Sequence, residues 1–112
     1  MLKIGVDVRD VAALHVKALT SRVAKNARIL AIAWHVFNID VVDALRRAFA
    51  DNEDALQRIP TMPGLDQRLD HYGTDSRLAE EVLGRNFITI EKCAKDTAES
   101  LWELDKKLKL DF

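Results

Sequence analysis

The three histidines are the side chains best suited to acid–base chemistry near neutral pH, but their spacing does not bring them together. His15 and His35 lie 20 residues apart, so on one straight helix they would point about 200° away from each other. His71 lies beside Asp70 and close to Asp66, a cluster that could hold a divalent ion or orient an imidazole. Because no second histidine or thiol is near it in the sequence, we expect an ordinary polar surface group and predict no metal site.

Cys93 and the glycines give no sign of nucleophilic or nucleotide chemistry. A catalytic cysteine needs a histidine and an orienting acid beside it, and nothing local supplies them to Cys93. A free cysteine next to an apolar helical face usually behaves as a small buried hydrophobe. The four glycines are too far apart to form a phosphate-binding loop, at Gly5, Gly64, Gly73 and Gly84. The sequence therefore predicts no catalytic residue and no cofactor.

Arg28 and His35 are separated by six residues, a spacing that would place both on one helical face two turns apart. This spacing resembles the R-x(4 to 6)-H motif of HEPN-type ribonucleases, which are small helical bundles and commonly dimers. The resemblance implies that Arg28 and His35 would help to cleave an RNA backbone. The polar residue that usually follows the arginine is replaced by Ile29. The alternative is an Arg28 on a solvated or interface face and a packed, hydrogen-bonded His35.

A basic flank is the clearest charge pattern. There is no Asp or Glu from Val11 through Ile39, while four cations recur there with helical spacing, at Lys17, Arg22, Lys25 and Arg28. Such a stripe could contact nucleic-acid phosphates, an anionic membrane surface or an acidic partner. It could equally pack against the acid-rich later segments of its own fold, because the formal net charge of the chain is only -1.

The first half of the sequence predicts a strand followed by helix. Residues 2–9 alternate in polarity, which is the period of a strand with one buried face, and the partner of this strand could be residues 86–90, another subunit or nothing. From Asp10 to Ala50 there is no glycine or proline, and apolar residues recur at intervals of three and four, so we expect helix. A break is expected near Asn38, where Asn38 or Asp40 could cap a second helix.

Local signals divide the second half. Residues 51–59 predict a short capped helix that Pro60 ends. Residues 60–64 contain both prolines and form the best candidate for a hinge between two helical hairpins. A weak helical segment at 65–72 should be followed by a helix that starts at Thr74 or Asp75 and that Gly84 ends in a left-handed conformation.

The last helix carries the strongest pattern of the chain. Its apolar residues follow the gaps of a heptad seam and form the expected interface, namely Ile90, Ala94, Thr97, Leu101, Leu104 and Leu108. The first half of this seam is weak, so we expect one wall of a bundle and not a free-standing coiled coil. Two long apolar helices and an unpaired strand are more apolar surface than one small chain easily covers.

The composition fits one folded domain over residues 1–112, since 48% of the residues are hydrophobic and 31% are charged. The start lacks the pattern of a signal peptide, and the longest apolar run, Ile29–Phe37, is far shorter than the roughly 20 residues that span a bilayer. The lone cysteine cannot form an intrachain disulfide and favours a reducing, cytoplasmic setting. We therefore expect a chain that is neither secreted nor membrane-spanning.

These observations predict a mainly α fold, a helical bundle with long N- and C-terminal helices and a short N-terminal β-strand as a minor element. The favoured function is a non-enzymatic assembly or regulatory protein, typical of small bacterial or phage proteins, that binds itself or another helical protein. One alternative is a nucleic-acid-binding regulator that uses the basic flank. The other is a HEPN-like ribonuclease that uses Arg28 and His35.

Overall fold

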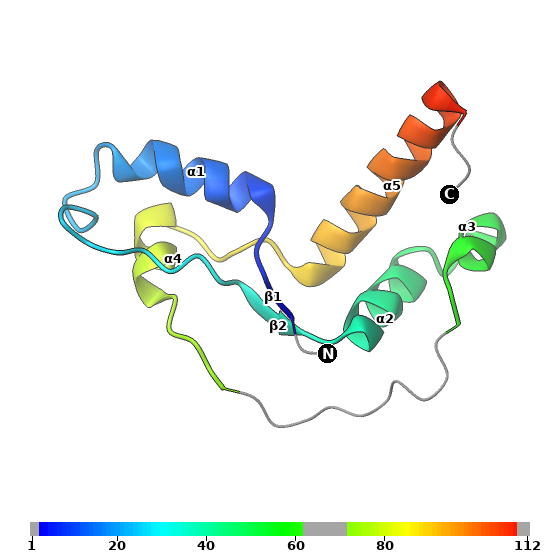
Figure 1. The fold of residues 1–112 in the computed structure, drawn as a ribbon, viewed down its shortest axis with the longest axis horizontal. Coiled ribbons are helices and arrows are strands. Elements are labelled where there is room, and N and C mark those ends of the chain that lie inside the picture. Colours follow the sequence, from blue (N-terminus) through cyan, green and yellow to red (C-terminus); the bar gives the residue numbers. More distant parts are fainter. Residues whose placement is uncertain (1–2, 62–71, 110–112) are drawn as a thin grey trace. The chain divides into compact units, whose positions relative to one another are not determined.

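A computed structural model describes residues 3–61 and 72–109 (Figure 1). The described residues form a two-stranded sheet and five helices, in the order β1 (Lys3–Gly5), α1 (Val8–Ala18), β2 (Trp34–Val36), α2 (Asn38–Ala48), α3 (Glu53–Arg58), α4 (Arg77–Leu83) and α5 (Ile90–Leu108). This confirms the prediction of a mainly α fold with a minor β element. The chain divides into two compact units, of which unit 1 contains β1, α1, β2 and α4, and unit 2 contains α2, α3 and α5. This division does not test the predicted single domain over 1–112, and residues 62–64 of the predicted hinge lie outside the described residues.

The N-terminal strand finds its partner within its own chain. β1 pairs antiparallel with β2, with Ile4 opposite His35 and Gly5 opposite Trp34. A Cβ atom on Gly5 would stand 2.9 Å from the Trp34 ring, so only glycine lets the indole lie against the strand. The indole Nε1–H in turn donates to the carbonyl of Ile88 at 3.0 Å. The candidate partner at 86–90 is therefore held by the Trp34 side chain and not by strand pairing.

Helix α1 is much shorter than the apolar pattern predicts. It begins after Asp7, whose carboxylate accepts from the backbone N–H of Arg9 at 2.8 Å and caps the first turn. It ends at Ala18, and the expected helix over the following residues is wrong, because they form turns, an extended segment and strand β2. Asn26 has a φ of 56°, in the left-handed region that a helix does not use. The expected start of a second helix near Asn38 is confirmed by α2.

The core of unit 1 lies between α1 and α4, whose axes run in clearly different directions in Figure 1. Leu14 of α1 packs on Leu83 and Val82 of α4, and the extended segment adds Ile29 to the same cluster. Gly84 ends α4 with a φ of 73°, as its sequence position predicts. The apolar run that looks helical from the sequence therefore packs as extended chain. An extended segment can be as hydrophobic as a helix, but its side chains repeat with a different period.

A buried carboxylate fastens the end of α4 to α1. Asp10 is fully buried, and its Oδ1 lies 2.6 Å from the Arg85 guanidinium in an ion pair. Its Oδ2 accepts from the backbone N–H of Ile88 at 2.8 Å. Asp10 therefore holds both ends of the short connection that follows α4.

The core of unit 2 centres on Trp102. Its ring lies 4.9 Å from that of Phe49, centroid to centroid, and packs with Val42, Ala55 and Ile59 from α2 and α3 and the turn after each. The Arg58 guanidinium lies 5.7 Å from the Trp102 ring centroid and pairs with Asp105 at 3.1 Å. The predicted helix at 51–59 is confirmed as α3, which Asn52 caps by accepting from the N–H of Ala55.

Helix α5 is present as predicted, but its packed face is rotated from the heptad seam. Ala94 of the seam is buried, whereas Leu101, Leu104 and Leu108 are 45%, 41% and 58% exposed. The residues that enter the core are Ala98 and Trp102, each one position after a seam residue and so about 100° further round the helix. The Trp102 indole packs against the cluster formed by α2, α3 and the turn after each, whereas the seam leucines do not belong to that cluster. Among the described residues, none of the helices combines the length and apolarity needed to cross a bilayer.

We predict that Trp102→Ala lowers the free energy of unfolding by about 3 kcal/mol, since it removes the side chain at the centre of the unit 2 core. Leu104→Ala, on the exposed seam, should cost less than about 1 kcal/mol. Urea unfolding of the two variants measures both values. Equal losses would mean that the heptad seam carries as much of the packing as Trp102 does.

Asp10→Ala should cost about 3 kcal/mol, because it leaves the Ile88 N–H without an acceptor and the Arg85 guanidinium without its anion. Asp75→Ala is the matched control, since Asp75 pairs with an arginine at the exposed surface. Its unfolding midpoint should stay close to that of the unchanged chain. A wild-type midpoint for Asp10→Ala in the same assay would show that the buried ion pair does not hold unit 1 together.

Candidate functional site

A polar pocket of about 420 Å³ lies on unit 1, where β2 meets the chain that leads into α4. Its polar lining consists of His35, Thr74, Asp75, Ser76, Arg77 and Glu80. This is the part of the described chain where an imidazole, two hydroxyl groups, two carboxylates and a guanidinium meet around one hollow. We therefore examine it first as the candidate site.

His35 is positioned by strand pairing and by two side chains. It stands opposite Ile4 in the sheet, which directs its ring to the pocket side of β2. Its Nε2 lies 3.3 Å from Thr74 Oγ1, within hydrogen-bonding distance, and the ring of Tyr72 stands edge-on with centroids 6.0 Å apart. These contacts hold an imidazole in a defined orientation at the pocket wall.

Ser76 and the pair of Asp75 and Arg77 shape the other wall. The Ser76 hydroxyl donates to the carbonyl of Ile32 at 2.8 Å and so ties the start of α4 to the extended segment before β2. Arg77 hydrogen-bonds the Asp75 carboxylate at 2.6 Å and lowers the pKa of Asp75 to about 2. The same contact raises the pKa of Arg77. The rim therefore carries a neutralised ion pair at all ordinary pH values.

This arrangement suits binding and orientation more than covalent catalysis. The hydroxyl of Ser76 is committed to a carbonyl, so no base stands ready to activate it. His35 and Thr74 can exchange hydrogen bonds with a polar group of a ligand. Asp75 and Arg77 neutralise each other, whereas Glu80 adds a further carboxylate to the lining, so the pocket favours a polar group without negative charge, such as a carbonyl or a hydroxyl.

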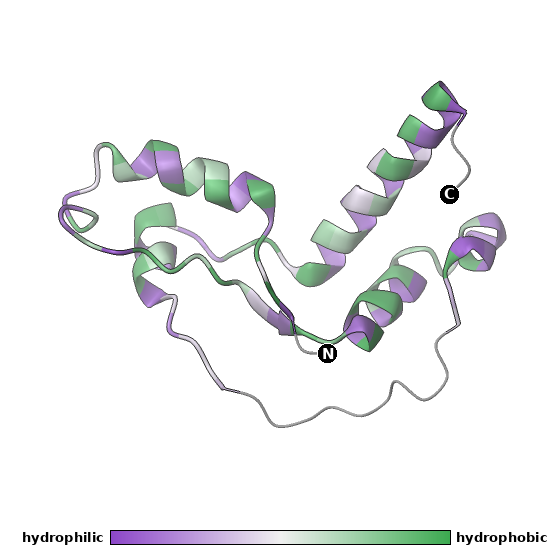
Figure 2. Cartoon of the chain, viewed as in Figure 1, coloured by the Kyte–Doolittle hydropathy of each residue, from purple (hydrophilic) through white to green (hydrophobic). Residues whose placement is uncertain are grey.

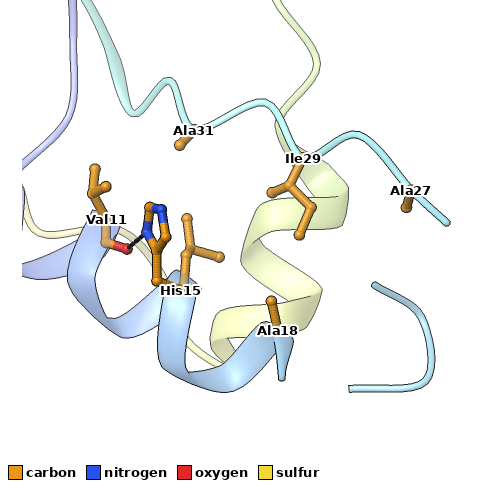
Figure 3. A pocket seen from close by; sticks show the side chains of 7 residues that line it. Val11, His15, Ala18, Ala27, Ile29 and Ala31 are labelled. Atoms are coloured by element: carbon orange, nitrogen blue, oxygen red, sulfur yellow. Dashed lines mark hydrogen bonds between the residues drawn. The ribbon is translucent and has the colours of Figure 1, made fainter. Parts of the chain in front are cut away.

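A second pocket of about 280 Å³ is almost entirely apolar (Figure 3). It is lined from α1 by Val11, Leu14, His15 and Ala18, and from the extended segment by Ala27, Ile29 and Ala31. His15 Nδ1 lies 2.8 Å from the carbonyl of Val11. Because a carbonyl can only accept, Nδ1 carries the proton and Nε2 of the neutral ring is left as an acceptor.

The structure separates the residues of the predicted basic flank. Lys17 lies on α1 and donates to the carbonyl of Leu83, the last residue of α4, where a cation is favourable at a helix C-terminus. Arg22, Lys25 and Arg28 follow the end of α1 in turns and extended chain, so the four do not form a helical stripe. The three arginine and lysine side chains beyond α1 are exposed.

The predicted pairing of Arg28 and His35 on one helical face is wrong. His35 lies in strand β2 and Arg28 in the extended segment before it, so the helical repeat that the HEPN-like spacing requires is absent there. The His35 ring instead contacts the side chain of Thr74, which lies 39 residues later in the sequence.

The remaining sequence candidates have simpler outcomes. Cys93 is half-buried on α5. The cluster of Asp66, Asp70 and His71 lies outside the described residues. Within residues 3–61 and 72–109, no group of three or more His, Cys, Asp or Glu side chains could hold a metal ion. The seam residues Ile90, Ala94, Thr97, Leu101, Leu104 and Leu108 lie on α5 as expected, and their use as an interface stays a prediction.

The polar pocket is not visible in the sequence. From the sequence, Thr74 is expected only as a helix cap and Ser76 has no expected role. Their partners, His35 and the Ile32 carbonyl, lie 39 and 44 residues away along the chain, so no local spacing reports the contacts. A useful local signal does exist at Asp7, because an aspartate directly before an apolar helical period is a helix cap.

Comparison with known proteins gives similarity over most of the chain. The chain is 34% identical over 105 residues to an uncharacterized oxidoreductase of Schizosaccharomyces pombe, a match that covers 93% of this chain and 30% of the relative. It is 31% identical over 98 residues to the ketoreductase azaE of Aspergillus niger, covering 88% of this chain and 28% of that protein. A second uncharacterized oxidoreductase of Schizosaccharomyces pombe is 31% identical over 99 residues. No protein-family model and no solved structure gives a significant match.

These relatives correct the functional predictions. All three carry the names of enzymes that transfer electrons, which contradicts a non-enzymatic assembly or regulatory protein and gives no support to nucleic-acid binding or RNA cleavage. All three are eukaryotic, which contradicts a bacterial or phage origin. The physical reason for the error is that no short motif of this chain carries chemistry, so the helical pattern alone guided the prediction. The chain spans less than a third of the length of each relative.

The Asp75 carboxylate should titrate near pH 2, and Arg77→Gln should return its pKa toward the ordinary value of 3.8, because the guanidinium hydrogen bond is the main cause of the shift. Carbon chemical shifts of the carboxyl group, followed by NMR from pH 5 down to about pH 1.5, measure the change. Lys107→Gln, at an exposed pair on α5, is the control and should leave the Asp75 midpoint unchanged. An Asp75 pKa near 3.8 in the unchanged chain would contradict the ion pair at the pocket rim.

Proposed function

We propose that this chain forms the substrate-binding part of an oxidoreductase that reduces a ketone group of a small molecule. The observation that carries the proposal is the similarity of nearly the whole chain to three enzymes, two named oxidoreductases and one a ketoreductase. The polar pocket supports it, since the His35 imidazole and the Thr74 hydroxyl can hydrogen-bond a carbonyl or an alcohol beside the Asp75 and Arg77 ion pair.

The hydride donor would be bound by another part of a longer protein. Ketone reduction needs a hydride, which a nicotinamide dinucleotide usually supplies. Such cofactors place their pyrophosphate at a helix N-terminus behind a glycine-rich turn. The only strand-to-helix turn of unit 1 in the described residues joins β1 to α1, and there the carboxylate of Asp7 already occupies the first turn. The Asp7 carboxylate, which the Arg9 guanidinium pairs at 2.8 Å, takes the place that a phosphate would need at this helix start, so this junction does not fit the cofactor.

The part of the reaction that falls to this chain is therefore binding and orientation. His35 and Thr74 would hydrogen-bond the oxygen of the substrate or a neighbouring hydroxyl group, and Ser76 would keep the wall in place through the Ile32 carbonyl. The Asp75 and Arg77 pair would disfavour a charged substrate at the rim. We also place the protein in the cytoplasm, on the ground that its single cysteine suits a reducing compartment.

The test is a chimera in which this chain replaces the matched segment of the Aspergillus niger ketoreductase. We expect the chimera to reduce ketones, measured as oxidation of reduced nicotinamide nucleotide over a panel of uncharged ketones. Thr74→Val and His35→Asn should each raise KM about tenfold, which corresponds to the loss of one hydrogen bond of roughly 1.4 kcal/mol. Lys107→Ala, on the exposed face of α5, is the control and should leave KM unchanged.

Two results would contradict the proposal. The first is a chimera that keeps the unfolding temperature of the parent enzyme and binds the reduced nucleotide but reduces none of the ketones that the parent reduces. The second is an active chimera in which Thr74→Val and His35→Asn behave like Lys107→Ala, which would remove the polar pocket from the substrate site.

A further inference from the structure

Helix α1 carries a row of apolar side chains that unit 1 leaves uncovered. Val8, Val16 and Leu19 are 77%, 67% and 85% exposed, and Ala12 between them is exposed as well. At about 100° per residue, positions 8, 12, 16 and 19 fall within roughly 80° of one another. Figure 2 shows that hydrophobic and hydrophilic residues follow each other along α1.

The uncovered row is a second apolar face and not the edge of the buried one. Ala13 and Leu14 pack against α4, and they point more than about 90° away from Leu19 and Val8. A surface helix has one apolar stripe, whereas a helix apolar on two faces is normally buried between two neighbours. Helix α1 has its first neighbour in α4, and the described residues of unit 1 leave its second apolar face exposed.

The apolar pocket of Figure 3 adjoins this row. Val11, His15 and Ala18 form its helical wall and lie on α1 directly beside the line through Val8 and Leu19. With about 280 Å³, the pocket has room for a large apolar side chain. A row of exposed apolar residues beside an apolar pocket is the usual layout of a protein interface with a central anchor.

The sheet of unit 1 is also incomplete. It has two strands of three residues each, and a two-stranded sheet is at best marginally stable in water. Each strand has one edge without a neighbouring strand within the described residues. Ile4 of β1 is about half exposed. Unit 1 therefore presents an unpaired sheet edge and an uncovered helix face.

We propose that the α1 row, with the adjoining apolar pocket, docks against the portion of an oxidoreductase that the relatives carry and this chain does not match. The inference rests on the proposed function. In each relative, the part outside the match is more than twice as long as the matched segment. The relatives therefore contain enough further chain to form such a neighbour. The occupant presents an apolar surface to Val16 and Leu19 and inserts one large apolar side chain beside His15.

A second copy of this chain fits the face poorly. Stable association of two copies needs roughly 800 Å² from each partner. The row holds only four small or medium apolar residues on a helix of 11 residues, which gives far less area when two such helices meet. A larger neighbour that also reaches the pocket and the sheet edge covers more surface.

The experiment is co-expression of this chain with the Schizosaccharomyces pombe oxidoreductase from which the matched segment has been deleted. We expect the two to co-purify as a one-to-one complex, measured by light scattering. The double variant Val16→Asp with Leu19→Asp should lower recovery of the partner at least tenfold. Since both residues are exposed, the variant chain alone should keep its unfolding temperature. Leu101→Asp with Leu104→Asp, exposed leucines of unit 2, is the matched control and should leave recovery unchanged.

Three outcomes overturn the proposal. In the first, the unchanged chain fails to retain the partner. In the second, the control double variant abolishes binding while the α1 double variant does not. In the third, the chain alone forms a dimer that the α1 double variant dissociates. None of these readouts depends on turnover. If the complex forms while the ketoreductase chimera stays inactive, the proposed function alone is contradicted. If the chimera is active but the α1 double variant still binds the partner, the docking alone is contradicted.

Discussion

The buried carboxylate of Asp10 is the contact on which unit 1 depends. A buried charge is costly unless it is paired, and Asp10 forms an ion pair with Arg85 and accepts a hydrogen bond from the N–H of Ile88. The indole of Trp34 holds the carbonyl of the same Ile88. The backbone N–H of Ile88 is therefore held by Asp10 of α1, and its backbone carbonyl is held by Trp34 of β2. This joins the sheet, α1 and the end of α4 into one body and sets the wall on which His35 stands.

The two units are stabilised by different physical means. Unit 1 has a small apolar core and relies on polar contacts between distant segments, including Lys17 to the end of α4. Unit 2 relies on one large aromatic side chain, Trp102, with the Arg58 and Asp105 pair at its edge. Polar contacts have geometric requirements that apolar burial lacks, so they hold a wall in a defined position. The polar pocket accordingly lies on unit 1.

Sequence reasoning succeeds here where the deciding physics is local. The helix end at Gly84, the short helix before Pro60 and the presence of a helix over α5 depend on a few residues each, and the structure has these elements as expected. It fails over residues 19–36, because an apolar run without glycine or proline has the same composition as helix and as packed extended chain. The pocket could not be predicted either, since His35 with Thr74 and Asp10 with Ile88 are contacts across 39 and 78 residues. The similarity to the named oxidoreductases appears only when 105 residues of the chain are compared together.

The exposed row of α1 explains why a bundle of self-associating helices is a natural reading of this sequence. The apolar period that includes Ala12, Val16 and Leu19 indicates a buried helix face, and unit 1 buries the neighbouring face instead. The apolar sequence pattern and the exposed row of α1 would agree if another protein surface covered the row. A helical sequence alone does not say whether that body is a second copy or another part of a larger enzyme. The docking proposed above takes the larger enzyme, because the relatives have most of their length beyond the match.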